Sequence, residues 1–128
     1  MRTLPEWSIA ITPTFVVSTA LATRDFQDVH HDKARAIELG SRDIFVNILT
    51  SQGLVQRYIT DSLGHDVEIR SIDIRLGAPA HPGDTLVFSG DIESEAEGVT
   101  TLKVRGDVVS SAPTNGMSHV TGTVVIKR

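Results

Sequence analysis

The chain contains no cysteine among its 128 residues, and aromatic residues make up only 5% of it. The absence of cysteine excludes disulfides, thiolate catalysis, iron–sulfur clusters and cysteine-ligated zinc. Lys and Arg are scattered singly, and the net charge is −4. Because polyanions are bound by clustered positive charge, this distribution argues against a partnership with nucleic acid or with an anionic membrane surface.

Long apolar runs are also missing. The first twenty residues include Trp7, Ile9 and Ile11, but Thr, Pro and Ser interrupt them repeatedly. A membrane-spanning helix needs about 20 consecutive apolar residues, so the sequence predicts neither a signal peptide nor a membrane anchor. We expect a cytoplasmic protein with one domain over residues 1–128, long enough to bury a core without disulfides.

The first part of the chain mixes apolar and polar segments. Residues 9–11 and 15–21 are rich in β-branched and aromatic side chains, which favours extended structure on both sides of Pro13. Residues 22–32 are polar and irregular and predict a loop. Residues 33–39 are good helix formers, and Gly40 follows them as the residue that ends a short helix.

A long helix is predicted next, over residues 44–63, with Gly64 ending it. About 20 residues of helix would be about 30 Å long. Gly53 within this helix costs about 1 kcal/mol relative to alanine, so we expect another backbone to approach it closely. The expected apolar face consists of Ile44, Ile48, Leu49, Val55, Tyr58, Ile59 and Leu63.

The apolar period changes from helical to alternating after Gly64. Alternating segments at 67–76, 85–94, 99–109 and 117–127 predict four antiparallel strands, the first with a bulge near Ser71. The predicted order is therefore strands, a loop, a short helix, a long helix and four strands, which is an α+β arrangement. We therefore predict a single hot-dog fold, in which a curved antiparallel sheet wraps one long central helix.

Acidic and imidazole side chains gather in the predicted loop, where His30 and His31 lie among Asp25, Asp28 and Asp32. Such groups can exchange protons near neutral pH. Adjacent histidines are poorly spaced for a metal and no third nitrogen ligand is evident, so we predict no metal. The structural alternative is a solvated loop in which Asp28 or Asp32 caps a helix. Most histidines elsewhere, His65, His81 and His119, are expected to be solvated or structural.

The same loop resembles the hydratase motif of the MaoC-like (R)-specific enoyl-CoA hydratase family, Asp-x-Asn-Pro-x-His followed by five residues and Ala or Ser. Asp25, His30 and Ala36 match this motif, whereas Gln27 and Asp28 replace its Asn and Pro. At the start of the long helix, where the family has His-Gly, this chain has Val-Asn at positions 46 and 47.

Residues 17–36 and 41–64 are similar, more specifically, to the small MaoC-like subunit of heteromeric enoyl-CoA hydratases that act in bacterial steroid side-chain degradation. The resemblance implies hydration of a trans-2-enoyl-CoA to a 3-hydroxyacyl-CoA, with Asp25 and His30 as the acid/base pair. It implies that the main-chain N–H of Asn47 meets the thioester carbonyl. No cofactor is implied. The implied partner is a second hot-dog subunit, a larger MaoC-domain protein or otherwise a second copy.

Two other functions remain open from the sequence. A hot-dog acyl-CoA thioesterase would use a carboxylate or amide on the long helix, where Asn47, Gln52 and Asp61 are the candidates. A non-catalytic hot-dog subunit would only support a catalytic partner. Release of free CoA, measured against loss of the enoyl double bond, separates hydrolysis from hydration.

Overall fold

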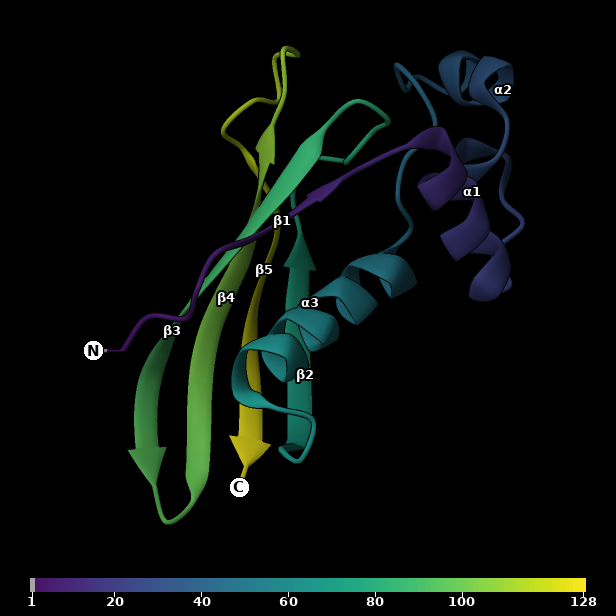
Figure 1. Ribbon diagram of the computed structural model, residues 1–128. Helices are drawn as coiled ribbons and strands as arrows, with labels where there is room; N and C mark the ends of the chain where they lie inside the picture. The colour runs from purple at the N-terminus through teal and green to yellow at the C-terminus, as the bar shows by residue number, and fades with distance from the viewer. Residues whose placement is uncertain (1) are drawn as a thin grey trace.

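The alternating apolar segments after Gly64 form one antiparallel sheet, seen in a computed structural model that describes residues 2–128 (Figure 1). Four of its strands follow the long helix as predicted, and a short strand near the N-terminus joins one edge. In spatial order the five strands are β1 (Trp7–Ala10), β3 (Thr85–Ala96), β4 (Val99–Val109), β5 (Ser118–Lys127) and β2 (Glu68–Leu76). All neighbouring strands pair antiparallel.

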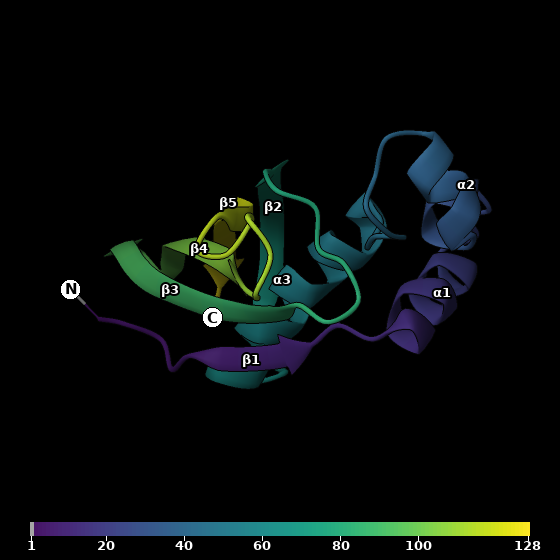
Figure 2. The same ribbon diagram turned by 90° about the horizontal axis from the view of Figure 1, so that it is seen from above.

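The sheet curves around helix α3 (Ile48–Leu63), which crosses one of its faces (Figures 1 and 2). The predicted irregularity in β2 is confirmed, because the pairing register with β5 shifts between Ile69 and Ser71. Further shifts occur in β3 and in the pairing of β4 with β5. Bulges bend strands and increase their twist, so the sheet can wrap the helix. This is the predicted α+β hot-dog fold.

The core lies between α3 and the inner face of the sheet. Val55 and Ile59 of the helix are fully buried, as are Leu102 and Val124 of the central strands. Tyr58 is also buried, and its hydroxyl donates a hydrogen bond to the Pro5 carbonyl at 2.7 Å. Burial of these side chains on one face leaves the opposite face of α3 exposed to solvent.

The predicted start of the long helix at residue 44 is wrong. α3 begins at Ile48, with Asn47 as its N-cap, and its 16 residues span about 24 Å. Residues 44–47 stay outside the helix because their backbone is used elsewhere: Phe45 N–H donates to Val29 and Val46 N–H to Ala80. Apolar spacing alone could not reveal these two contacts.

Two expectations about the faces of α3 are also wrong. Ile48 and Leu49 are about half exposed, at 53% and 50%, because the first turns of the helix bury Ser51 and Leu54 instead. A Cβ added at Gly53 would meet no atom within 4 Å, so no backbone approaches this glycine. Gly53 therefore weakens an exposed helix face without a packing reason inside the chain.

Residues 15–21 form a helix rather than the predicted extended segment. α1 (Pro13–Ala22) begins at Thr12, whose side chain accepts the Phe15 N–H at 3.0 Å, and Pro13 occupies the first helical position. Proline is favoured there because its missing N–H would have no partner in any case. Thr12 and Pro13 thus start a helix. The extended structure predicted for residues 15–21 is wrong because it relied on their β-branched composition and not on this start signal.

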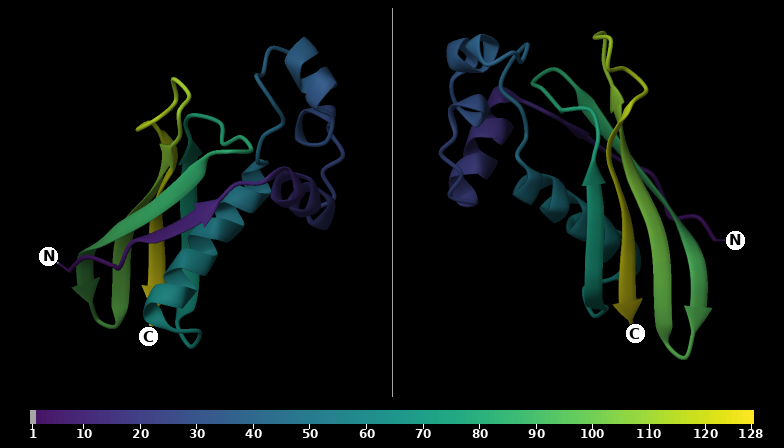
Figure 3. Two further views of the ribbon diagram at one scale, coloured as in Figure 1. Left: turned by 45° about the horizontal axis from the view of Figure 1, so that its top comes forward. Right: turned by 180° about the vertical axis from the view of Figure 1, so that it is seen from behind.

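Two smaller elements complete the chain: the 3₁₀ turn η1 (Asp28–His30) and the short helix α2 (Lys33–Glu38). α2 confirms the predicted helix at 33–39 within a residue, and Gly40 follows it with φ +99°. Together with α1 they form a lobe at the N-terminal end of α3, beyond the sheet (Figure 3). Within residues 2–128, no helix combines the length and apolar character needed to cross a membrane.

We expect Gly53→Ala to raise the free energy of unfolding by about 1 kcal/mol, because it removes the conformational cost of an exposed helical glycine. Urea unfolding of the isolated chain measures this. Gly106→Ala is the contrasting variant: its Cβ would lie 2.9 Å from Cε1 of the buried Phe88, and overpacking costs about 1–3 kcal/mol. An unchanged free energy of unfolding in Gly53→Ala would contradict a conformational cost of glycine at this position.

Candidate active site

Asp25 lies immediately after α1, where the backbone reverses. Its N–H donates to the Ala20 carbonyl at 2.8 Å, and the Arg24 N–H donates to Leu21 at 3.0 Å. This pair of bonds is the Schellman arrangement that commonly ends a helix. Arg24 occupies its left-handed position with φ +58°, although glycine is the residue usually found there. The end of α1 thus fixes the backbone of Asp25.

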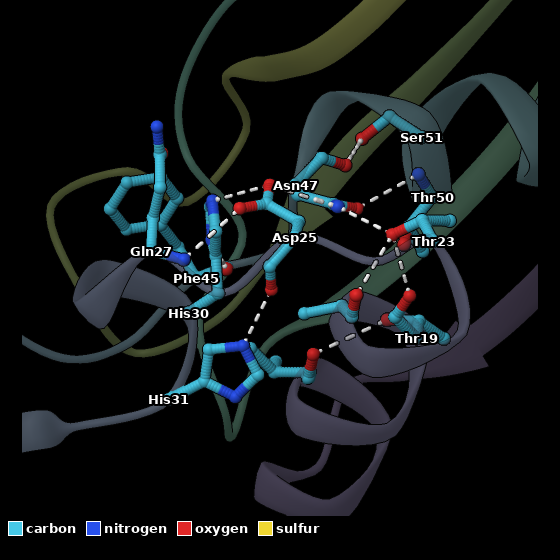
Figure 4. A network of polar contacts seen from close by, with 12 residues as sticks. Thr19, Thr23, Asp25, Gln27, His30, His31, Phe45, Asn47, Thr50 and Ser51 are labelled. Atoms are coloured by element: carbon cyan, nitrogen blue, oxygen red, sulfur yellow. Dashed lines mark hydrogen bonds and ion pairs between the residues drawn. The ribbon is translucent and has the colours of Figure 1, made fainter.

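His30 ends η1 and points back toward Asp25 (Figure 4). Its Nε2 lies 3.3 Å from Asp25 Oδ2, and its Nδ1 lies 2.7 Å from the Phe45 carbonyl oxygen. A carbonyl only accepts, so Nδ1 carries the hydrogen and Nε2 of the neutral ring presents its lone pair to the carboxylate. The structure therefore brings together the two residues that the sequence placed in one loop.

The second histidine of the pair has a different position. His31 Nε2 lies 2.6 Å from the main-chain oxygen of Asp25, to which it donates (Figure 4). The neighbouring acidic residues are structural, as the alternative interpretation held. Asp32 caps α2 by accepting the Arg35 N–H at 3.1 Å, and Asp28 forms an ion pair with Arg35 at 3.4 Å. His31 therefore restrains the backbone of Asp25 rather than facing its carboxylate.

Asn47 joins the loop to the start of α3. Its Oδ1 accepts the Thr50 N–H at 3.0 Å, and its Nδ2 donates to Thr23 Oγ1 at 2.8 Å and to Asp25 Oδ2 at 3.1 Å. The residue is 2% exposed. Among residues 2–128, the structure gives the main-chain N–H of Asn47 no acceptor. A helix N-terminus with free N–H groups favours a partly negative oxygen.

The surroundings of Asp25 favour its ionised form. Partial burial by itself would raise the pKa of this carboxyl. Hydrogen bonds from the Asn47 amide and the Gln27 N–H, together with the two neighbouring imidazoles, outweigh burial and bring the pKa below its ordinary value. Asp25 is therefore a carboxylate at neutral pH, beside an imidazole that can take or give a proton.

The remaining histidines do not join this pair. His119 is buried, and its ring bonds the Ala78 carbonyl and the Ser51 hydroxyl, each at 2.7 Å. His81 is buried beside Ser41 at 3.2 Å. Burial lowers the pKa of both rings. Both rings thus have their contacts away from Asp25 and His30. Sequence reasoning missed Thr23 and the Phe45 carbonyl as part of the site, because only tertiary contacts bring them there.

Two hollows on the surface of the described residues lie away from the Asp25–His30 pair. The larger, about 810 Å³, lies mainly over the outer face of the sheet, where Arg75 and Lys103 contribute to its lining. The smaller lies by the hairpin between β3 and β4. Within residues 2–128, no group of three acidic or histidine side chains is placed to hold a metal ion. Asp25, with its side chain 22% exposed, lines neither of these two hollows.

Comparison with known proteins identifies the family. No protein-family model matches the chain. It is 54% identical over 121 residues to the 3-oxo-4,17-pregnadiene-20-carboxyl-CoA hydratase beta subunit of Mycobacterium tuberculosis, covering 94% of this chain and 89% of that one. The chain belongs to the MaoC-like hydratase family. The family membership implied by Asp25, His30 and Ala36 is thereby confirmed.

Solved structures of this family have the same fold. A chain of the ChsH1–ChsH2 complex from M. tuberculosis superposes with a TM-score of 0.91 at 51% identity, over 98% of this chain and 94% of that chain. The (R)-hydratase of A. caviae involved in PHA biosynthesis superposes with a TM-score of 0.87 at 20% identity, over 98% and 93% of the two chains. The second similarity concerns the fold alone.

The left-handed backbone of Arg24 gives a prediction about stability. Substitution Arg24→Gly should raise the free energy of unfolding by about 1 kcal/mol, because glycine adopts positive φ without the steric cost of a Cβ. Arg24→Ala is the control, since it removes the same charge and keeps the steric cost. Thermal or urea unfolding compares the three proteins. Equal stability of the glycine and alanine variants would contradict strain at this position.

Proposed function

We propose that this chain is the catalytic subunit of an enoyl-CoA hydratase. The reaction adds water across the 2,3 double bond of a trans-2-enoyl-CoA and gives a 3-hydroxyacyl-CoA. The observation that carries the proposal is the pair of acceptors formed by His30 Nε2 and Asp25 Oδ2, 3.3 Å apart. With Nδ1 held by the Phe45 carbonyl, Nε2 of the neutral imidazole and the ionised Asp25 carboxylate have no hydrogen to donate to each other. One water molecule can donate to both.

The chemistry follows from these two acceptors. As the water oxygen bonds to C3, His30 Nε2 takes one of its protons, and the electrons of the double bond move toward the thioester oxygen to form an enolate. The Asp25 carboxylate orients the water and stabilises the imidazolium. Return of a proton from the pair to C2 completes the addition of one H and one OH. Positioned acid–base groups typically contribute about 10²–10⁴-fold to a rate.

The start of α3 supplies the second requirement of this reaction. Negative charge develops on the thioester oxygen in the enolate, and backbone donors placed to meet it lower the barrier. The free main-chain N–H of Asn47 is the donor we assign to this oxygen, at the positive end of a helix of 16 residues. The structure gives the other side-chain candidates for a thioesterase on this helix no contact with Asp25 or His30 within residues 2–128. Gln52 is exposed, and the exposed Asp61 pairs with Arg57 at 3.4 Å.

The name of a relative supports the substrate class. The relative that is 54% identical to this chain is the 3-oxo-4,17-pregnadiene-20-carboxyl-CoA hydratase beta subunit. We infer that this chain likewise acts on the CoA thioester of a steroid side chain. Coenzyme A then enters as part of the substrate, and the reaction as written needs no other cofactor.

The position of the site and a free sheet edge support a second subunit. Asp25 and His30 lie in the lobe beside α3, and neither residue lines the two hollows described above. Strand β2 forms one edge of the sheet with nine residues, and edge strands carry backbone groups that can pair with another chain. The relatives are a beta subunit and a chain of a two-protein complex. We infer a heteromer in which a larger MaoC-domain subunit completes the substrate groove.

Asp25→Asn and His30→Ala should each lower kcat/KM for hydration by about 10²–10⁴-fold. The first removes the negative charge that orients the water and stabilises the imidazolium, and the second removes the group that takes the proton. The assay follows the loss of enoyl absorbance with the purified complex, together with free CoA. His65→Ala is the control, since this exposed histidine lies outside the site. Near-full activity of either site variant, with an unchanged circular dichroism spectrum, would overturn the proposal. Release of free CoA at the same rate as loss of the enoyl absorbance would indicate a thioesterase.

Co-expression with a MaoC-domain protein from the same genome should give a stable heteromer, whereas the chain alone should show little or no hydratase activity. Light scattering after size exclusion measures the mass of the chain alone and of the mixture. Full activity of the chain alone, as a monomer or a homodimer, would contradict the proposed heteromer but would leave the roles of Asp25 and His30 intact.

A further inference from the structure

The Asn47 side chain forms three hydrogen bonds inside the protein, and only one of them belongs to helix capping. Its Oδ1 accepts the Thr50 N–H, which is the ordinary contact of an N-cap residue. Its two Nδ2 hydrogens go to Thr23 Oγ1 and Asp25 Oδ2. The side chain is thus fully satisfied while 2% exposed (Figure 4).

The orientation of this amide is determined by its neighbours. Thr23 uses its own hydroxyl hydrogen toward the Thr19 carbonyl at 2.8 Å, so its oxygen is free to accept. The Asp25 carboxylate can only accept, and the Thr50 N–H can only donate. A flipped amide would place an N–H against Thr50 and an oxygen against Asp25. Only one of the two orientations therefore satisfies all three partners.

Capping alone does not explain why position 47 is asparagine. Ser, Thr, Asp and Asn all favour the N-cap. A hydroxyl has a single hydrogen and a carboxylate has none, whereas an amide offers an acceptor for Thr50 and two donors on the opposite side. Of these four residue types, only Asn can cap α3 and also donate to both Thr23 and Asp25.

We propose that the Asn47 carboxamide is a positioning residue for the proposed hydration, which holds the Asp25 carboxylate at the start of α3 facing His30. This inference rests on the proposed function and adds a role for the Asn47 side chain to that of its main-chain N–H. Asp25 Oδ1 is held separately by the Gln27 N–H at 3.2 Å. The Asn47 amide therefore fixes Oδ2, the oxygen that lies 3.3 Å from His30 Nε2.

The contact also has an electrostatic consequence. A hydrogen bond donated to the charged form of an acid stabilises that form, and the Asn47 amide is one of the groups that lower the pKa of Asp25. Removal of the donor should raise that pKa, and replacement of the donor by a second carboxylate should raise it further. In both cases less of Asp25 is ionised at a given acidic pH.

Two variants of Asn47 separate positioning from capping. Asn47→Ser keeps a favoured N-cap and removes the contact with Asp25, whereas Asn47→Asp keeps the oxygen for Thr50 and places a carboxylate oxygen where Nδ2 lies, 3.1 Å from Asp25 Oδ2. We expect kcat to fall about 10- to 100-fold in both variants, as for loss of a hydrogen bond to a charged group. The acid limb of the kcat/KM profile should move to higher pH, furthest in Asn47→Asp.

The pKa of Asp25 gives a readout that does not depend on activity. Carbon-13 NMR of the side-chain carboxyl groups, assigned with Asp25→Asn, follows its titration in the purified protein. Tyr58→Phe is the control, because it loses a hydrogen bond of α3 to Pro5 and makes no contact with Asp25. We expect it to leave the pKa of Asp25 and the pH profile unchanged.

The outcomes distinguish the two proposals. If the pKa of Asp25 rises in the Asn47 variants while the wild-type protein lacks hydratase activity, the positioning contact stands and the proposed function fails. If the wild-type protein is a hydratase and neither the pKa of Asp25 nor the acid limb moves in either variant, Asn47 only caps the helix and the inference is overturned. Should Asn47→Asp fail to fold, Asn47→Ser decides alone.

Discussion

A helix leaves its first backbone N–H groups without partners inside the helix. In α3 the Asn47 side chain provides an acceptor for one of them. The Asn47 carboxamide satisfies Thr50 and, on its other side, reaches the end of α1 through Thr23 and Asp25. The main-chain N–H of Asn47 stays without an acceptor in the described residues. Asn47 therefore caps α3 and restrains the Asp25 carboxylate with its side chain. Its main-chain N–H remains as a donor for a ligand oxygen.

Residues 44–47, which precede α3, hold the His30 ring in place. Phe45 accepts the hydrogen of His30 Nδ1, while its own N–H donates to Val29. Val46, the next residue, donates to Ala80 in the connection between β2 and β3. Residues 44–47 thus connect His30 to the β2–β3 connection of the sheet. The tautomer and the direction of the His30 ring depend on a backbone carbonyl rather than on a second side chain.

The lobe that carries Asp25 and His30 is anchored to the core by only a few side chains. Most of the apolar core lies between α3 and the curved sheet, and Val16 of α1 and Ala36 of α2 extend it into the lobe. That lobe carries a left-handed Arg24 at the turn into Asp25, and unfavourable backbone conformations often persist at functional sites. In the proposed heteromer, a second subunit that covers the lobe would shield the site from bulk solvent while the reacting water stays between Asp25 and His30.

Local patterns in the sequence were sufficient for much of this structure. Alternation after Gly64 gave the four strands and the bulge at Ser71, and the spacing of Asp25, His30 and Ala36 pointed to the family. These features depend on a few neighbouring residues. The helix at 13–22 was missed because its β-branched composition outweighed the start signal of Thr12 and Pro13.

The tertiary structure decided what depends on residues distant in the sequence. Residues 44–47 stay extended because they bond Val29 and Ala80, and Gly53 has no close neighbour although the sequence suggested one. His30 and His31 are adjacent in the chain, but only His30 faces the carboxylate, because a carbonyl fifteen residues away holds its ring. The sequence by itself thus indicated Asp25, His30 and Asn47. Long-range hydrogen bonds added Thr23 and the Phe45 carbonyl and determined which atoms of these groups face one another.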